Sequence, residues 1–180
     1  MTEALLQNYQ LQEEVIGRGR FGVIRRCFNR QSGQHAACKT ITKADLHASV
    51  DRECLNNEIK IMQYLSGHPT VVSLHDVYED DEYLHLVMEM CSGGDLFDRI
   101  VSKKKIVPFS EEEDATILQK FMEAISYCHS MGIAHRDIKP NNILFANNSN
   151  SLAEIKLADF GQASFFSPGM IIMLARFPCH

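Results

Sequence analysis

The sequence HRDIKPNN (residues 135–142) is followed by DFG (residues 159–161), and these two segments carry the most chemical information in the chain. They supply two aspartates, a lysine at position 139 and the amide of Asn142. The aspartates can accept a proton or bind a cation, and the amide oxygen is a further ligand for a hard cation such as magnesium. The pattern therefore predicts a site for proton acceptance and metal coordination.

Apolar segments border this polar sequence on both sides. Ile143–Phe145 and Ile155–Leu157 are short, and each adjoins a polar cluster, which predicts a small hairpin that carries functional loops. On the N-terminal side, Ser110 and Glu113 form a capping-box pattern, and apolar residues at helical spacing continue to Gly132. The sequence therefore predicts a long amphipathic helix before the polar loop.

The sequence GRGRFG (residues 17–22) has the spacing of a phosphate-binding glycine loop. A dinucleotide-binding turn with this spacing must open into a helix, whereas VIRRCF (residues 23–28) is typical of a strand. The glycines are therefore predicted at the tip of a hairpin, where backbone N–H groups can approach phosphates without a Cβ in the way. Taken alone, an ordinary glycine hairpin explains the pattern equally well.

A lysine and a glutamate follow the glycine pattern. Lys39 ends the apolar run AACK (residues 36–39), and Glu58 lies on the polar side of a predicted helix, Arg52–Leu65, where it can pair with the lysine. A solvated strand end is the alternative for Lys39. Because all five features occur in order along one chain, chance is a poor explanation for them.

The first half of the chain is predicted to form a sheet. Short apolar segments alternate with glycine or acidic turns, and the helix Arg52–Leu65 stands between the third and the fourth segment. We expect an antiparallel sheet of five strands with one helix packed on it. The expected strands are Gln10–Arg18, Gly22–Asn29, Gln34–Thr40, Val71–Glu79 and Tyr83–Met90.

Composition and charge exclude several classes of protein. The 180 residues are 45% hydrophobic and 23% charged, which is typical of a globular chain. The net charge of -5 argues against binding to nucleic acid or to a membrane surface. The 6 cysteines show no CxxC spacing, which favours thiols in a reducing compartment over a zinc site. With no signal-peptide or membrane-spanning pattern, we expect a monomer in the cytoplasm, with the nucleus as the alternative.

On these motifs the chain resembles the eukaryotic protein kinases from about Tyr9 to about Ala163. Lys139 after Asp137 is similar to the serine/threonine class. The resemblance to plant kinases of the phosphoenolpyruvate carboxylase kinase and calcium-dependent protein kinase type is carried by YQLQEEVIGRGRFG, AACKTITKADL, DRECLNNEIKIM and HLVMEMCSGGDLFDRI.

The resemblance implies an α+β, bilobal kinase-like fold. The N-lobe would be a five-stranded antiparallel sheet with one main helix, and the helical C-lobe would be incomplete. The implied division is an N-terminal extension over residues 1–8, an N-lobe over 9–90, a partial C-lobe over 91–163 that ends at the DFG segment, and a divergent tail over 164–180.

The resemblance also implies that the chain binds ATP and Mg²⁺ and transfers the γ-phosphoryl group to serine or threonine hydroxyls of a protein substrate, for which phosphoenolpyruvate carboxylase is one candidate. Asp137 would accept the hydroxyl proton, and Lys139 would neutralise charge on the transferred group. Asn142 and Asp159 would bind magnesium. The residues carried over to the nucleotide site are Ile16, Gly17, Arg18, Gly19, Arg20, Phe21, Gly22, Ile24, Ala37, Lys39, Glu58, Met88, Glu89, Cys91, Asp95 and Leu144.

Within this set the resemblance implies distinct roles. The three glycines would cover the phosphates, and Lys39, oriented by Glu58, would hold the α- and β-phosphates. Ile24 and Ala37 would contact the adenine from one side and Leu144 from the other. Met88 would be the gatekeeper before the hinge residues, and Asp95 occupies a position that contacts ribose or a basic substrate residue.

The pattern breaks after Gly161. Gln162 replaces the usual leucine, and residues 165–180 contain no activation threonine segment and no Ala-Pro-Glu sequence. The tryptophan of the Asp-x-Trp helix is also missing, since the chain has no tryptophan. We therefore expect a C-terminally truncated kinase with an incomplete peptide site. The alternative is a catalytically inactive fragment that binds nucleotide or competes for partners.

Overall fold

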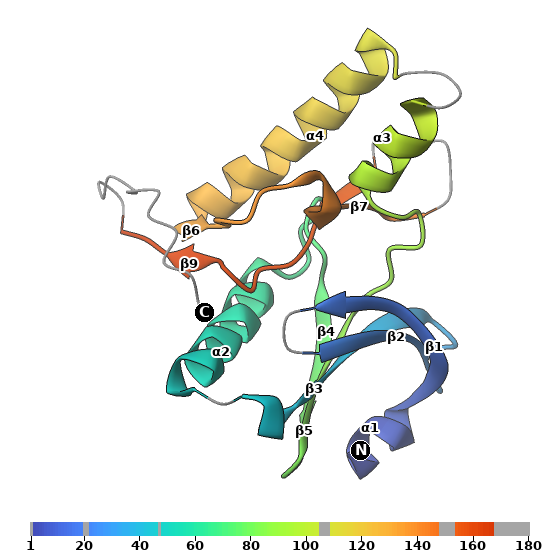
Figure 1. Cartoon of the computed structure of the whole chain (residues 1–180), viewed down its shortest axis with the longest axis vertical. Helices are drawn as coiled ribbons and strands as arrows, with labels where there is room; N and C mark the ends of the chain where they lie inside the picture. Colours follow the sequence, from blue (N-terminus) through green and yellow to red (C-terminus); the bar gives the residue numbers. More distant parts are fainter. Residues whose placement is uncertain (1, 20–21, 47, 105–108, 148–153, 168–180) are drawn as a thin grey trace. The chain divides into compact units, whose positions relative to one another are not determined.

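The computed structural model describes residues 2–19, 22–46, 48–104, 109–147 and 154–167. The chain divides into two compact units. Unit 1 comprises Met1–Arg52 and Ser73–Met90, and unit 2 comprises Glu53–Val72 and Cys91–His180. Figure 1 shows the helices and strands of both units, coloured along the sequence.

Unit 1 is built on an antiparallel sheet of five strands in the order β1-β2-β3-β5-β4. The central strand β3 is buried along most of its length, in keeping with its apolar sequence. A 3-10 turn, η1 (Lys43–Asp45), follows it. The predicted five-stranded antiparallel sheet is confirmed. Its strands are β1 (Tyr9–Gly19), β2 (Gly22–Asn29), β3 (His35–Thr42), β4 (Leu74–Glu79) and β5 (Tyr83–Glu89).

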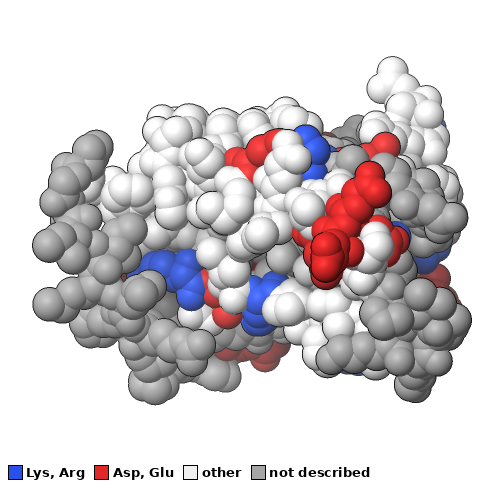
Figure 2. All heavy atoms as spheres, turned by 90° about the horizontal axis from the view of Figure 1, so that it is seen from above, with Lys and Arg blue, Asp and Glu red and all other residues white. Residues whose placement is uncertain are grey.

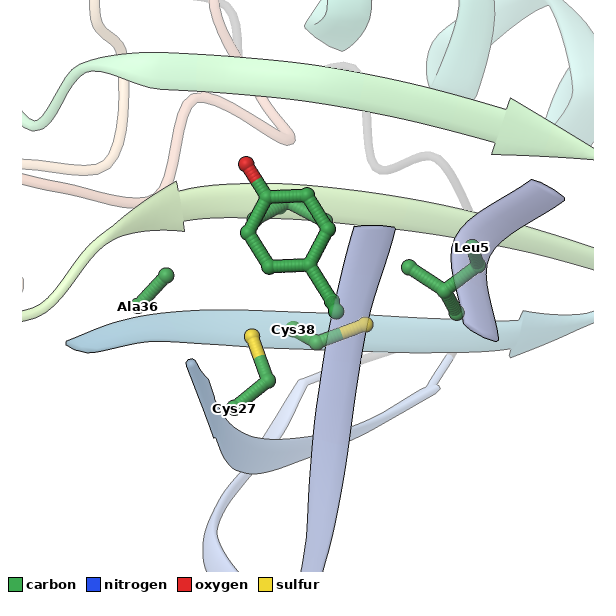
Figure 3. Packing of buried hydrophobic residues seen from close by; sticks show 6 residues of the cluster. Leu5, Cys27, Ala36 and Cys38 are labelled. Carbon is green, nitrogen blue, oxygen red and sulfur yellow. The ribbon is translucent and has the colours of Figure 1, made fainter. Parts of the chain in front are cut away.

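A short helix, α1 (Glu3–Asn8), covers one face of this sheet. Figure 3 shows the side chains of Leu5, Cys27, Ala36 and Cys38 in the cluster beneath it, which also includes Tyr9 and Val87. Burial raises the pKa of the Cys27 thiol to about 12 and that of the Cys38 thiol to about 11, so both remain protonated core side chains. The sequence analysis did not predict this helix, because six residues carry too little periodicity to identify one.

Helix α2 (Ser49–Leu65) ends where predicted but begins before Arg52. The Asp51 carboxylate accepts a hydrogen bond from the Ala48 N–H at 3.2 Å, which satisfies a backbone donor at the helix start.

The strand predicted from Val71 is wrong at its start, because β4 begins only at Leu74. Val71 instead bridges Leu157, and the Val72 N–H donates to the Leu157 carbonyl at 3.0 Å. Two buried valines look the same in sequence whether they continue a strand or connect two elements.

Unit 2 contains α2 from Glu53 onward, together with the helices α3 (Leu96–Lys104) and α4 (Glu111–Ser130). The predicted capping box is confirmed: the Glu113 N–H donates to Ser110 Oγ, and the Ser110 N–H donates to the Glu113 carboxylate. Both helices pack against the hairpin of β7 (Ile143–Phe145) and β8 (Ile155–Leu157), as Figure 1 shows. The shared core consists of Leu96, Ile117, Ile143, Phe145 and Ile155. Helix α3 was not predicted.

A second strand pair joins β6 (Ile133–Ala134) to β9 (Ser164–Phe165). The polar sequence 135–142 connects β6 to β7, and the DFG sequence lies between β8 and β9. Because β6 pairs with β9 and β7 pairs with β8, the two polar segments are held side by side. The strand pairing therefore positions the candidate site.

Among the described residues, no helix is long and apolar enough to cross a bilayer. The first turn of α4 carries four acidic side chains, Glu111, Glu112, Glu113 and Asp114. Figure 2 shows acidic groups (red) gathered to the right of centre, with Lys and Arg (blue) in small separate groups. The described atoms of that face therefore form no extended basic surface.

Candidate active site

Asp137 lies at the centre of a hydrogen-bond network in unit 2. Lys139 Nζ lies 2.6 Å from Asp137 Oδ2, and Asn142 Nδ2 donates to the same oxygen at 3.1 Å. Asn142 Nδ2 also donates to the Asp137 carbonyl at 2.8 Å. Asn142 is buried and belongs to a short 3-10 helix, η2 (Pro140–Asn142). These contacts hold the Asp137 carboxylate in one orientation beside a cation.

The pKa of Asp137 lies below its ordinary value. Burial raises this pKa, but the hydrogen bonds from Lys139 and Asn142 and the positive charge of Lys139 together outweigh burial. The carboxylate is therefore ionised at neutral pH. In that state it can accept a hydrogen bond from a hydroxyl group and take its proton during a reaction.

His135 connects this loop to the DFG turn. The Asp137 N–H donates to His135 Nδ1 at 3.3 Å, and His135 Nε2 donates to the Ala158 carbonyl at 3.0 Å. Because Nδ1 accepts a hydrogen bond, the ring is neutral with its proton on Nε2. Burial lowers the pKa of His135, which favours the same neutral form. This side chain therefore positions both loops.

Asp159 has a φ of 62°, which is uncommon for a residue other than glycine. The Ala158 N–H donates to the Asn142 carbonyl at 2.9 Å, and the Gly161 N–H donates to Asp159 Oδ1 at 3.4 Å. Phe160 is fully buried and packs edge-on against His135 with ring centroids 4.8 Å apart. The turn is thus anchored to the loop that contains Asp137.

The chemistry of Asn142 and Asp159 fits a magnesium site. The amide nitrogen of Asn142 bonds to Asp137, which leaves the amide oxygen as the atom that would ligate a cation. Asp159 offers a carboxylate, and Mg²⁺ commonly takes only one or two such ligands together with waters and substrate phosphates. In the described ranges, no group of three or more His, Cys, Asp or Glu side chains is arranged so that it could hold a metal ion.

Asp95 has a structural role beside the predicted ligand role. Its Oδ1 accepts the Asp98 N–H at 2.7 Å, which caps the start of α3. Its Oδ2 accepts a hydrogen bond from Asn141 at 3.2 Å, and its backbone bridges Leu144. Asp95, Leu144 and the loop 135–142 therefore lie close together in unit 2.

In unit 1 the three glycines lie where β1 pairs with β2, at the end of the hairpin nearest its turn, as predicted. Gly19 pairs with Gly22, and Gly17 pairs with Ile24. A Cβ on Gly22 would overlap the Thr40 carbonyl, so glycine is required for β2 to pair with β3. A Cβ on Gly19 would lie 3.4 Å from Lys39 Cε, so the hairpin backbone passes close to the lysine side chain.

Several predicted nucleotide residues share one face of the sheet. Ile24 pairs with Lys39, and Ala37 pairs with Met88. Directly paired residues point to the same side, and residues two apart on a strand do as well. Ile24, Ala37, Lys39 and Met88 therefore lie on the face opposite the Ala36, Cys38 and Val87 cluster under α1.

Glu58 lies beside the DFG turn, because a Cβ built on Gly161 would lie 3.6 Å from Glu58 Oε2. Lys39 belongs to unit 1 and Glu58 to unit 2, so their pairing stays a prediction. Glu89 accepts the Ser73 N–H at 3.3 Å through its carboxylate. Ile16 and Cys91 are half-buried, and Arg18 is exposed. Arg20 and Phe21 lie outside the described residues, as does most of the predicted divergent tail.

Comparison with known proteins identifies the family. The model of the protein kinase domain matches residues 10–173, which extends into the tail that the sequence analysis sets apart. The chain is 44% identical over 161 residues to calcium-dependent protein kinase 7 of Arabidopsis thaliana, covering 89% of this chain and 29% of that protein. The chain therefore belongs to the protein kinase family.

Two further relatives are similar. Calcium-dependent protein kinase 20 of Oryza sativa subsp. japonica is 45% identical, covering 89% of this chain and 28% of the relative. Serine/threonine-protein kinase PEPKR2 of Arabidopsis thaliana is 46% identical, covering 87% of this chain and 30% of the relative. The chain thus spans less than a third of the length of these curated relatives.

Sequence reasoning missed a residue that contacts the segment following the DFG sequence. Asn57 Nδ2 on α2 donates to the Ala163 carbonyl at 2.9 Å. Two asparagines, Asn56 and Asn57, precede Glu58, and the sequence alone does not show which of them points toward the turn. The helical position of Glu58 is the only signal that could have drawn attention to its neighbour.

Proposed function

We propose that this chain is the catalytic part of a serine/threonine protein kinase, which transfers the γ-phosphoryl group of MgATP to a protein hydroxyl. The observation that carries the proposal is the geometry around Asp137. Its ionised carboxylate lies 2.6 Å from Lys139 Nζ and accepts a hydrogen bond from the Asn142 amide. The Asn142 backbone carbonyl accepts the Ala158 N–H and so ties this loop to the DFG turn. Membership of the protein kinase family supports the same assignment.

The proposed roles in unit 2 follow from charge and orientation. Asp137 accepts the proton of the substrate hydroxyl and orients it for attack, while Lys139 offsets negative charge on the phosphoryl group. Asp159 and the amide oxygen of Asn142 bind magnesium, which when bound neutralises charge on the phosphates. Leu144 contacts the base, and Asp95 contacts ribose or a basic residue of the substrate.

The proposed roles in unit 1 follow from the shared sheet face. Gly17, Gly19 and Gly22 offer bare backbone to the phosphates, and Lys39 binds the α- and β-phosphates. Ile24, Ala37 and Met88 lie on the same face as Lys39, where apolar side chains would contact the adenine. In this proposal Glu58 orients Lys39 and the segment Glu89–Cys91 borders the base.

The proposed substrate class is a protein with serine or threonine at the acceptor position, because Lys139 follows Asp137 as in that class of kinases. Phosphoenolpyruvate carboxylase is retained as one candidate substrate, and the cytoplasm as the proposed compartment. Both rest on the resemblance in sequence and are tested only by experiment.

The test is transfer of labelled γ-phosphoryl from ATP to a basic peptide that differs only in its acceptor residue: serine, threonine, tyrosine or alanine. We expect magnesium-dependent labelling of the first two peptides. ATP-induced thermal stabilisation is measured in parallel, since a ligand that binds the folded state raises the melting temperature. Stabilisation without labelling would instead support the non-catalytic nucleotide-binding fragment. The absence of both labelling and stabilisation would refute both hypotheses.

A further inference from the structure

Asn57 links helix α2 to the segment that follows the DFG turn. Its Nδ2 donates to the Ala163 carbonyl at 2.9 Å, and Ala163 is only 6% exposed. Both residues belong to unit 2. We propose that Asn57 is a positioning residue that keeps Asp159 in its magnesium-binding geometry by fixing the C-terminal side of the turn. This inference rests on the proposed function in one respect, namely that Asp159 binds the metal.

The turn needs a restraint because Asp159 occupies the left-handed region, with a φ of 62°. A side chain with a Cβ adopts this conformation at a cost in free energy, so the surrounding contacts must maintain it. On the N-terminal side, Ala158 bonds to His135 and to the Asn142 carbonyl, so the catalytic loop holds that end. An equivalent restraint is required after Asp159.

On the C-terminal side, two bonds meet at Ala163. The Ala163 N–H donates to the Phe160 carbonyl at 3.0 Å, which closes the turn, and the Ala163 carbonyl accepts from Asn57. A hydrogen bond to a largely buried carbonyl is costly to leave unmade. Removing the amide therefore loosens the turn at this point while the contacts of Ala158 remain.

A ring contact from α2, between Tyr64 and Phe165, is less directional. Tyr64 packs edge-on against Phe165 with ring centroids 6.2 Å apart, but both rings are about half exposed. Such a ring contact allows the two rings to slide, whereas the hydrogen bond from the Asn57 amide restricts both a distance and an angle. Asn57 also directly precedes Glu58 on α2. A movement of this part of the helix would therefore reach the turn through the hydrogen bond from Asn57 to the Ala163 carbonyl.

The experiment compares Asn57→Ala and Asn57→Asp with the matched control Asn56→Ala. Asn57→Asp keeps the size of the side chain and removes the donor, and Asn56 is an exposed neighbour on the same helix. The first readout is amide hydrogen exchange without nucleotide. We expect the Gly161–Ala163 segment to exchange at least about fivefold faster in both Asn57 variants and unchanged in the control.

The second readout is the ratio of ATP affinity with and without Mg²⁺. Loss of a residue that orients a metal ligand typically costs roughly 10- to 100-fold in metal-dependent affinity, so this ratio should fall about tenfold in the Asn57 variants. ATP affinity without metal should stay unchanged. A purely structural role would lower the melting temperature and leave the ratio intact.

Unchanged exchange at 161–163 in Asn57→Asp would overturn the inference, and so would an unchanged Mg²⁺ ratio in a chain that binds ATP. If the unsubstituted chain binds no ATP, the proposed function fails. The hydrogen-exchange result then still decides whether Asn57 holds the turn, because it requires no ligand.

Discussion

The glycine hairpin of unit 1 and the loop 135–142 of unit 2 are each positioned within their own unit, and the means are opposite. Gly19 and Gly22 have no side chain, and strand pairing positions their backbone. In the loop the side chains do the positioning, through bonds among His135, Asp137 and Asn142. We therefore expect the hairpin to be sensitive to an added Cβ at Gly22, and the loop to be sensitive to the loss of a polar atom.

The largest expected effect belongs to the loop. Asp137→Asn preserves the size of the side chain but removes the proton acceptor, so phosphoryl transfer should fall roughly 10²- to 10⁴-fold while the chain stays folded. The measurement is the initial rate of peptide phosphorylation together with a thermal melt. Asp98→Asn, at an exposed acid in the first turn of α3, is the control and should retain the rate. Equal rates in both variants would remove Asp137 from the reaction.

The next effect distinguishes two glycines of the hairpin. Gly22→Ala places a Cβ into the Thr40 carbonyl, so strand pairing must shift and the free energy of unfolding should fall by about 1 to 3 kcal/mol. The Cβ of Gly19→Ala would contact only the flexible end of the Lys39 side chain. The free energy of unfolding should therefore hardly change, whereas ATP affinity should fall. Denaturant unfolding and ATP titration of both variants separate these outcomes. A Gly22→Ala variant as stable as the parent would contradict the close approach of Gly22 to the Thr40 carbonyl.

A smaller effect, on the free energy of unfolding, is expected from a substitution at the start of α4 in unit 2. Ser110→Ala removes both the acceptor for the Glu113 N–H and the reciprocal geometry of the capping box, which should cost about 1 kcal/mol. Ser126→Ala in the exposed middle of the same helix is the control and should not destabilise. Urea unfolding of both variants checks the difference, and equal midpoints would contradict it.

The smallest effect is a pH dependence of unit 1. His85 is fully buried on β5, its Nδ1 lies 3.0 Å from Thr40 Oγ1, and burial lowers its pKa from the ordinary value of 6.5, against the opposing charge of Asp80. A lowered histidine pKa means that the contribution to stability is present above about pH 6.5 and is lost as the pH falls below it. Unfolding free energies measured at about pH 7.5 and about pH 5.5 should therefore differ less in His85→Gln than in the parent. His75→Gln, on an exposed position of β4, should leave the difference unchanged, and the prediction fails if both variants behave alike.

Sequence reasoning succeeded where a pattern has a single physical solution. The strand after GRGRFG excludes a helix, and Ser110 with Glu113 marks one helix start, so both features were predictable. It failed at α1, whose docking depends on Leu5 entering a distant cluster, and at Val71, which pairs with Leu157 rather than extending β4. These features depend on tertiary contacts that local patterns do not contain.

The candidate site shows the same division. The residue types of the loop could be identified from sequence, but the neutral state of His135 and the cap formed by Asp95 follow only from their partners in space. Asn57 shows the limit most clearly, because its neighbour Asn56 is chemically identical and only the helix orientation separates them.

The central claim of the proposed function is that MgATP binding by this chain depends on both Lys39 and Asp159. Calorimetric titration of MgATP into the parent chain, Lys39→Met and Asp159→Asn tests it most directly, with Lys43→Met, whose partner is the exposed Glu79, as the control. We predict that each of the first two substitutions weakens binding at least about tenfold, or about 1.4 kcal/mol, and that the control does not. Unchanged affinity in either Lys39→Met or Asp159→Asn would contradict the claim.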